Sequence, residues 1–322
     1  AAMIRRFELG PSHRVVEVAS NDGYLLQYFQ AAGIPVLGID PARNCAEAAA
    51  AKGIPTEIRF FGAETARALA PAYSADLMAA NNVLAHVPDI NDFVEGFRIL
   101  LQPEGVATFE FPHLLNLIQH NEFDTIYHEH YSYLSLYTTQ QIFAAHELTV
   151  FDVAELPSHG GSLRLFIRHT ANNRLSLEPG VARILDREEQ AGLTRLDGYL
   201  GFESKVRKVK RDLLKFLIAA KEAGQTVAGY GAPAKGNTLL NYCGVRTDLL
   251  AFTVDRSPHK HGKFLPGTRI PVFPPKRIME ARPDFLLILP WNLRDEIMEQ
   301  MKGIREWGGK FVVPIPELQV LP

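Results

Sequence analysis

The sequence predicts an α/β fold made of two Rossmann-like, doubly wound domains that are joined by helices. Short apolar runs at residues 14–19 and 34–40 each end in a turn and precede a segment with helical spacing. The same alternation returns after residue 225. Between about 177 and 223 the chain is rich in charge and carries one apolar stripe opposite a basic, solvated face, which is typical of helices that connect two domains. We therefore expect a first domain at 1–170, a helical connector at 171–223 and a second domain at 224–322.

The composition is that of an ordinary globular protein. The 322 residues are 47% hydrophobic and 22% charged, and the formal net charge is −2, which argues against a nucleic-acid partner. The two cysteines, Cys45 and Cys243, cannot supply a cysteine-rich metal site or a disulfide framework. The sequence has no signal-peptide pattern and no apolar run long enough to span a bilayer, so we expect a cytoplasmic protein without a membrane partner. The oligomeric state stays open.

The first strand and its turn indicate the type of cofactor. A dinucleotide fingerprint needs several glycines for close approach to a pyrophosphate, but this turn has only Gly23, and Ala19 stands where many such sites have glycine. Glu17 lies inside the strand, and Asp40 closes the second strand where it can accept from ribose hydroxyls. This pattern favours S-adenosyl-L-methionine (SAM), which has an adenosine, no phosphates and a positive charge. The predicted cofactor-binding residues are Glu17, Ser20, Asn21, Gly23, Asp40, Pro41, Gly62, Asn81 and Asn82.

Two further strands are predicted to end at the same edge of the sheet. A run at 75–79 leads to Asn81 and Asn82, with His86 a few residues on, and a helix over 90–101 follows. After the turn at 103–105, the strand VATFEFP brings Glu110 to the same rim. Ligands of open α/β sheets bind at the carboxyl ends of the strands, so these residues are candidates for the site.

The stretch 121–137, NEFDTIYHEHYSYLSLY, has the highest density of chemically active groups. It holds three carboxylates, two imidazoles and four phenols in seventeen residues. A base that works near neutral pH, oriented by a carboxylate and flanked by phenols, needs such a set. A helix over 139–146 and strands at 149–157 and 163–170 follow. The turn between these strands adds candidates that a hairpin alone does not explain, so the predicted substrate-binding residues of this half are Glu110, Tyr131, His159, Gly160, Gly161, Ser162 and Arg164.

The second half opens with the strand TVAGY and a glycine-containing turn that precedes a helix over 239–243. Backbone amides and a helix N-terminus make such a turn an anion site. It is not a P-loop, but it satisfies G-x-G-x-x-A, and a later strand ends in Asp255, so NAD remains an alternative cofactor for this half. The predicted substrate-binding residues here are Tyr230, Gly231, Ala232, Lys235, Gly236, Asn237, Asp255, Lys260 and Lys263.

Together these segments resemble the sugar C-methyltransferases that act on nucleotide-linked 4-keto deoxyhexoses. The matching segments are VVEVASNDGYLL, NNVLAHVPD, FDTIYHEHYSYLS and HGGSLR, followed by GYGAPAKGN and VDRSPHKHGKFLPG. They occur in order over nearly the whole chain, and YHEH with HGGSLR is a specific pair.

The resemblance implies SAM as methyl donor, with S-adenosyl-L-homocysteine as product, bound by a class I methyltransferase domain. It also implies that the second Rossmann-like domain holds the nucleotide sugar. His130 is implied as the base, Glu129 and Tyr127 as its active-site partners, and His86 as a further active-site group. The family usually begins with a small cysteine-rich zinc domain, whereas this sequence starts at AAMIRRFELG, just ahead of the first strand. We therefore expect no zinc site within this chain and assign no metal ligands.

The expected chemistry is methylation of the carbon next to a ketone, with dTDP as the expected nucleotide of the sugar. A 4-keto group acidifies the hydrogen on C3, so one base and one donor to the enolate oxygen suffice. His130 is the nearby side chain whose ordinary pKa, about 6.5, suits removal of that proton. Two alternatives remain open: an NAD-dependent nucleotide-sugar oxidoreductase, and a non-catalytic nucleotide-sugar-binding protein.

Overall fold

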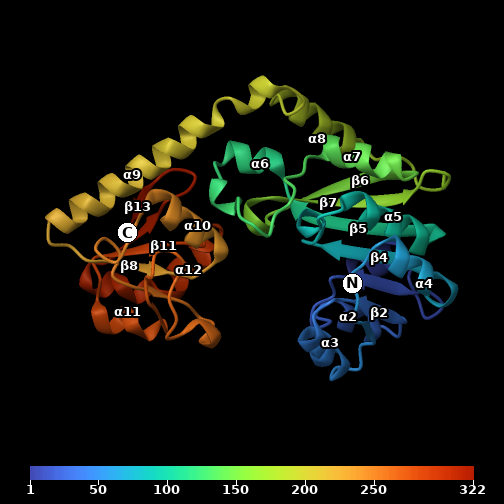
Figure 1. Cartoon of the computed structure of the whole chain (residues 1–322), viewed down its shortest axis with the longest axis horizontal. Helices are drawn as coiled ribbons and strands as arrows, with labels where there is room; N and C mark the ends of the chain where they lie inside the picture. Colours follow the sequence, from blue (N-terminus) through green and yellow to red (C-terminus); the bar gives the residue numbers. More distant parts are fainter. The chain divides into compact units, whose positions relative to one another are not determined.

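The computed structural model describes residues 1–322, which divide into two compact units. The first unit comprises Ala1–Leu115 and Glu129–Thr194, and the second comprises Asn116–His128 and Arg195–Pro322. Each unit is built around its own sheet (Figure 1). The predicted fold class, α/β with two Rossmann-like sheets, is confirmed.

The first unit contains a seven-stranded sheet in the order β3-β2-β1-β4-β5-β7-β6. The first five strands in this order are parallel, whereas β7 is antiparallel to both β5 and β6. Its strands are β1 (Val15–Val18), β2 (Val36–Ile39), β3 (Thr56–Glu57), β4 (Ala75–Asn81), β5 (Leu101–Pro112), β6 (Leu148–Leu156) and β7 (Ser162–His169).

Helices cover both faces of this sheet, as expected for a doubly wound fold. Side chains of α4, α5, α7 and α8 join one buried cluster, and those of α2 and α3 join another. Neighbouring strand residues alternate between the two clusters, as Val15 and Val16 of β1 do. The helices are α1 (Ala2–Arg6), α2 (Leu26–Gln30), α3 (Arg43–Ala50), α4 (Ala63–Tyr73), α5 (Ile90–Leu100), α7 (Leu136–Ala145) and α8 (Pro179–Gln190), with short 3-10 turns η1 (Leu84–His86) and η3 (Ser158–Gly160).

The second unit contains a six-stranded sheet in the order β10-β9-β8-β11-β12-β13, parallel except for β13. Its strands are β8 (Val227–Tyr230), β9 (Thr253–Val254), β10 (Val272–Phe273), β11 (Phe285–Ile288), β12 (Lys310–Val313) and β13 (Gln319–Leu321). Its helices are α9 (Phe202–Glu222), α10 (Ala234–Cys243), α11 (Lys276–Ala281) and α12 (Arg294–Gln300), with 3-10 turns η2 (Phe123–Thr125), η4 (Leu196–Tyr199), η5 (Pro258–Lys260), η6 (Trp291–Leu293) and η7 (Lys302–Trp307). Helix α6 (Leu114–Gln119) begins in the first unit and ends in the second.

The compact units differ from the predicted domain ranges in three places, one of which is that α9, although part of the predicted connector, belongs to the second unit. Helix α8 packs with α7 and β6 and so belongs to the first unit, although it lies in the predicted connector 171–223. Residues 116–128 lie within the predicted first domain but pack with the second unit. The apolar stripe expected in this region is buried in α9, and α8 buries a further apolar stripe. None of the helices combines the length and apolar character that a membrane span requires.

Candidate active site

The parallel strands of the first sheet bring the predicted cofactor residues to one edge. Glu17 lies in β1, residues 20–23 form the turn after it, and Asp40 and Pro41 follow β2. Asn81 ends β4, and Asn82 comes directly after it. Because β1, β2 and β4 are parallel neighbours, their carboxyl ends meet at the same edge. The structure therefore places most of this predicted set together.

Glu17 is a buried acid without a full set of partners. The residue is only 1% exposed, and its Oε2 atom has no hydrogen-bond partner. Burial, helped by the negative charges of Asp40 and Asp22, raises the pKa of the Glu17 carboxyl to about 8. A cationic ligand beside Glu17 would favour its ionised form, whereas a pyrophosphate would not, so the residue fits SAM better than a dinucleotide.

The backbone of the turn adopts the left-handed region without glycine at several positions. Ala19, Asn21 and Asn82 have φ values of 58°, 52° and 53°, and Gly23 has 74°. Asparagine tolerates this region, whereas alanine pays a steric cost there, which accounts for glycine at the position of Ala19 in many similar turns. The N–H groups here are used within the chain: those of Ala19 and Ser20 donate to Ile39, and that of Asn21 donates to Asp40.

Two of the predicted cofactor residues, Asp40 and Gly62, have structural roles within the chain, whereas the hydroxyl of Ser20 is buried without a partner. Asp40 accepts the backbone N–H groups of Asn21 and Ala42, each at 2.9 Å, and so shapes the loop. Ser20 is fully buried, and a Cβ at Gly38 would lie 2.4 Å from its Oγ atom. A Cβ at Gly62 would lie 2.0 Å from a carboxylate oxygen of Asp92, so the packing at this position requires a glycine. Their contacts with a cofactor stay predictions.

His86 and His130 lie close together although they are far apart in the sequence. Their ring centroids are 4.7 Å apart in an edge-to-face arrangement, and the ring of Tyr133 lies 5.8 Å from that of His130. The backbone N–H groups of Tyr131 and Ser132 both donate to the carbonyl of the residue before His86. The segment that carries His130 is thus attached to the end of β4, beside the predicted cofactor edge.

Glu110 and Arg164 form an ion pair between β5 and β7, in which Glu110 is buried and Arg164 is partly exposed. Arg164 Nη2 lies 2.5 Å from Glu110 Oε2, and the Ser158 hydroxyl donates to Oε1 at 2.9 Å. The two residues are direct partners in the ladder. Glu110 is 7% exposed, so its charge is balanced by its neighbours, and it orients the turn after β6. In that turn His159, Gly160 and Gly161 all have positive φ, which explains the double glycine.

The remaining residues of the YHEH motif are more accessible. Tyr127 is half-buried, whereas His128, Glu129 and Tyr131 are exposed. Tyr131 is 64% exposed, which leaves its phenol accessible to a substrate. The first two residues of the motif belong to the second compact unit and the last two to the first.

In the second unit, the acid at the end of β9 is saturated by its own chain. Asp255 accepts the backbone N–H groups of Ala232 and Ser257, each at 2.8 Å, and pairs with Lys260 at 3.0 Å. Burial alone would raise the pKa of Asp255, but these donors hold it below the usual value. Lys263 is exposed and not among these partners. A ribose-binding acid of an NAD site needs open acceptor positions.

Lys235 lies in a buried network at the start of α10. Its Nζ atom donates to Asn292 at 2.9 Å and lies 4.6 Å from the centre of the Trp291 ring. Burial lowers the pKa of Lys235, while the nearby Asp124 and Glu122 oppose this shift. Burial raises the pKa of both acids to about 7. Lys235 is therefore occupied by partners of its own chain.

The other predicted residues of this turn surround Lys235. Tyr230 is 5% exposed, and its hydroxyl donates to Gln300 at 2.9 Å. Gly231 and Gly236 allow close packing, because a Cβ would meet Pro290 at 2.5 Å or Leu289 at 2.7 Å. Asn237 lies in the first turn of α10.

The sequence prediction missed Tyr24 and Ser158. Tyr24 follows the turn after β1 and is 47% exposed. Its pKa is raised by partial burial and by the charges of Glu17 and Glu110, which places its phenol near both acids. The sequence NDGY places a phenol directly after the predicted cofactor turn, and this could have indicated Tyr24. Ser158 carried no recognisable signal, because its contact with Glu110 depends on the pairing of β5 and β7.

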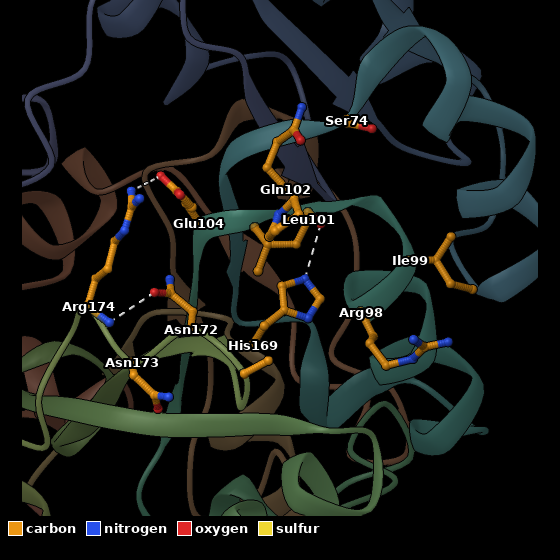
Figure 2. Close-up of a pocket in the computed structure, with 12 residues that line it drawn as sticks. Ser74, Arg98, Ile99, Leu101, Gln102, Glu104, His169, Asn172, Asn173 and Arg174 are labelled. Atoms are coloured by element: carbon orange, nitrogen blue, oxygen red, sulfur yellow. Dashed lines mark hydrogen bonds and ion pairs between the residues drawn. The ribbon is translucent and has the colours of Figure 1, made fainter.

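A pocket of about 630 Å³ lies in the first unit, away from these residues. It is lined at the start of β5 and the end of the antiparallel β7, and hence at the amino-end edge of the parallel strands. Figure 2 shows Arg174 directed at Glu104, with His169 directed at the backbone of Leu101. Arg174, Glu104 and His169 therefore have partners within the chain. No group of three or more His, Cys, Asp or Glu side chains is arranged to hold a metal ion.

Comparison with known proteins assigns the class and then the family. The family model described as a methyltransferase domain matches residues 2–153, most of which lie in the first unit, and so assigns the class of methyltransferases. A second model, the C-methyltransferase C-terminal domain, matches residues 157–316. The C-methyltransferase NovU of Streptomyces niveus is 38% identical over 319 residues, which are 99% of this chain and 76% of that protein. The chain belongs to the C-methyltransferase family and is a SAM-dependent enzyme.

Solved structures with similar folds cover about half of the chain. A SAM-dependent methyltransferase from Anabaena variabilis is 15% identical, with a TM-score of 0.43 over 52% of this chain and 82% of that chain. The magnesium protoporphyrin IX methyltransferase of Synechocystis PCC 6803 with bound SAM is 14% identical, with a TM-score of 0.40 over 52% of this chain and 75% of that chain.

Membership of the C-methyltransferase family sets aside the oxidoreductase and non-catalytic alternatives.

Proposed function

We propose that this C-methyltransferase acts on the carbon next to the ketone of a nucleotide-linked 4-keto deoxysugar, with dTDP as the expected nucleotide. His130 removes the proton from that carbon and leaves an enolate. The observation that supports this most directly is the pair of imidazoles, His86 and His130, 4.7 Å apart at the end of β4. One imidazole can take a proton from carbon while the other donates to the enolate oxygen.

The residues of the first sheet edge fit SAM, which supplies an electrophilic methyl group when bound. Glu17 balances positive charge, the loop shaped by Asp40 accepts the ribose, and Asn82 offers a buried Oδ1 atom without a partner. In the transfer, the new carbon–carbon bond uses the electron pair of the enolate, and the carbon–sulfur bond breaks to leave a neutral thioether. The proton stays on His130 until solvent removes it.

The remaining active-site residues hold the substrate and the base. Tyr127 and Glu129 are proposed as partners of His130, and Tyr131 and the HGGSLR turn as contacts of the sugar. In the second unit, the turn from Tyr230 to Asn237 is proposed to hold the nucleotide. Because Lys235 and Lys260 already pair with their own chain, backbone amides supply most of its binding groups.

Exchange of the C3 hydrogen with solvent tests the role of His130 apart from methyl transfer. The enzyme is incubated in deuterated buffer with dTDP- and GDP-linked 4-keto sugars, and the C3 signal is followed by NMR. We expect His130→Asn to slow exchange and methylation by about 10²–10⁴-fold while SAM binding is kept. His128→Asn, an exposed neighbour, is the matched control. A His130→Asn enzyme with near-normal turnover would refute the assignment.

A further inference from the structure

A second buried acid lies outside the site described above. Glu188 of α8 is 0% exposed. Its Oε1 atom accepts the backbone N–H of Leu136 at 2.6 Å, and its Oε2 atom accepts that of Tyr137 at 2.9 Å. These are the first two amides of α7, which have no acceptor within the helix. A carboxylate from a different helix therefore sits directly on the N-terminus of α7.

The same carboxylate also contacts a buried histidine. His113 Nε2 lies 2.7 Å from Glu188 Oε1, and both side chains are fully buried. His113 directly follows β5, and it forms an isolated bridge with Leu134. The backbone N–H of Leu114 also donates to Leu134 at 3.0 Å. Glu188 thus joins the residue that leaves β5 to the residues that begin α7.

Between these two points the chain makes the excursion that carries the YHEH motif. It leaves the first unit after Leu115 and returns at Glu129, immediately before His130. The only chain between His130 and α7 is residues 131–135. A displacement of the first turn of α7 therefore acts on His130 through a short, directly connected segment.

A role in stability alone does not account for this network. Ser135 already caps α7, because its Oγ atom accepts the N–H of Thr138 at 3.1 Å. Burial of a carboxylate and an imidazole costs free energy, and apolar residues of the same volume would often stabilise the fold as well. The Nδ1 atom of His113 is also buried without a partner. What the buried pair of Glu188 and His113 provides is a fixed position of the first turn of α7 relative to the end of β5, set by directional hydrogen bonds.

We propose that Glu188, acting through His113 and the first turn of α7, is a positioning residue that holds His130 in its working place. The catalytic part of this inference rests on the proposed function of His130. The positional part does not, because it concerns the order of residues 131–136 in the enzyme without substrate.

The first test measures that order by hydrogen exchange in Glu188→Gln, with Glu189→Gln, an exposed neighbour in α8, as control. The side-chain NH2 group of glutamine takes the place of one carboxylate oxygen of Glu188. A hydrogen-bond donor then faces another donor, and one hydrogen bond of Glu188 is lost. We expect the amides of Tyr131 and Ser132 to exchange at least about tenfold faster. The amides of β1 should keep their rates, as should every amide in the control. Unchanged protection of Tyr131 and Ser132 would overturn the proposal.

The second test asks whether Glu188 acts through His130. We expect Glu188→Gln to lower kcat by about 10–10²-fold with the Kd of SAM unchanged, as for a base displaced by about 1 Å. In a His130→Asn background the same substitution should have no further effect on C3 exchange. If Glu188→Gln slowed C3 exchange in the His130→Asn background by as much as it does in the wild type, the proposal would be overturned. If the wild-type enzyme exchanges C3 of no 4-keto sugar, the proposed function fails, whereas the amide test still decides this inference.

A second pair of variants covers the case in which Glu188→Gln does not fold. Glutamine at position 113 can still donate to Glu188, whereas leucine cannot. We therefore expect His113→Leu to loosen the amides of Tyr131 and Ser132, and His113→Gln to retain most of their protection. Equal protection in the two variants would overturn the proposal.

Discussion

The proposed place of Glu17 beside SAM predicts that the binding of SAM depends on pH. Its pKa in the free enzyme is raised to about 8 by burial and by Asp40 and Asp22. At pH 7 about nine in ten molecules therefore carry a protonated Glu17. A cationic cofactor favours the ionised form, so binding must first remove this proton. Between pH 6 and pH 8, the Kd of SAM should fall by up to about tenfold per pH unit, and it should level off above pH 8.

Titration calorimetry of the enzyme and of Glu17→Gln, over pH 6 to 9, measures this effect. The amine of SAM titrates in the same range, but equally for both proteins, so the ratio of the two Kd values isolates Glu17. At pH 7, two buffers with different ionisation enthalpies should report about 0.9 proton released by the enzyme beyond that released by the variant. A ratio that does not change with pH would refute the protonated state of Glu17 in the free enzyme.

Three further predictions concern stability. The pKa of Asp124 is raised to about 7 in the folded state, so the stability that its protonated form contributes is lost as pH rises through 7. The Tm of Asp124→Asn should therefore increase relative to that of the wild type between pH 6 and pH 8. A difference in Tm that does not depend on pH would contradict this. Arg164→Met leaves Glu110 buried without its cation and should lower the free energy of unfolding by about 2–3 kcal/mol in urea titrations, with Arg164→Lys as the milder control. Ala19→Gly removes a side chain at φ 58° and should stabilise the fold by up to about 1 kcal/mol, whereas Ala19→Val should destabilise it.

The order of strands and helices could be predicted because each element carries a local signal. Apolar runs end at Asp40 and at Asn81, and both runs are strands in the structure. Helix starts were less visible. The helix predicted at 139–146 begins at Leu136, because Ser135 and the distant Glu188 satisfy its first amides. A cap supplied by another helix leaves no trace in the local sequence.

The site was predictable where its residues share strand ends, and not where it depends on pairing across the sheet. The topology rule brings Glu17 and Asn82 to one edge, and the sequence gives their positions along the strands. The partners of Glu110 follow instead from the register of β5 with β7. The burial of Lys235 beneath Trp291 requires the packing of residues 116–128 against α10, which no local pattern encodes.

The charges at the two sheet edges support the proposal that the two sheets bind different ligands. At the first edge, Glu17 is buried without a balancing cation, and it therefore favours a cationic ligand. At the second edge, Asp255 is balanced by Lys260 and two backbone amides, so no negative charge remains to repel a phosphate group. We expect that a change in the ligand specificity of either edge would need a change in these charges and not in the glycines of the turns. Lys260→Met should therefore weaken binding of a dTDP-sugar by about tenfold while the Kd of SAM stays the same, and equal weakening of both ligands would contradict the assignment of the two edges.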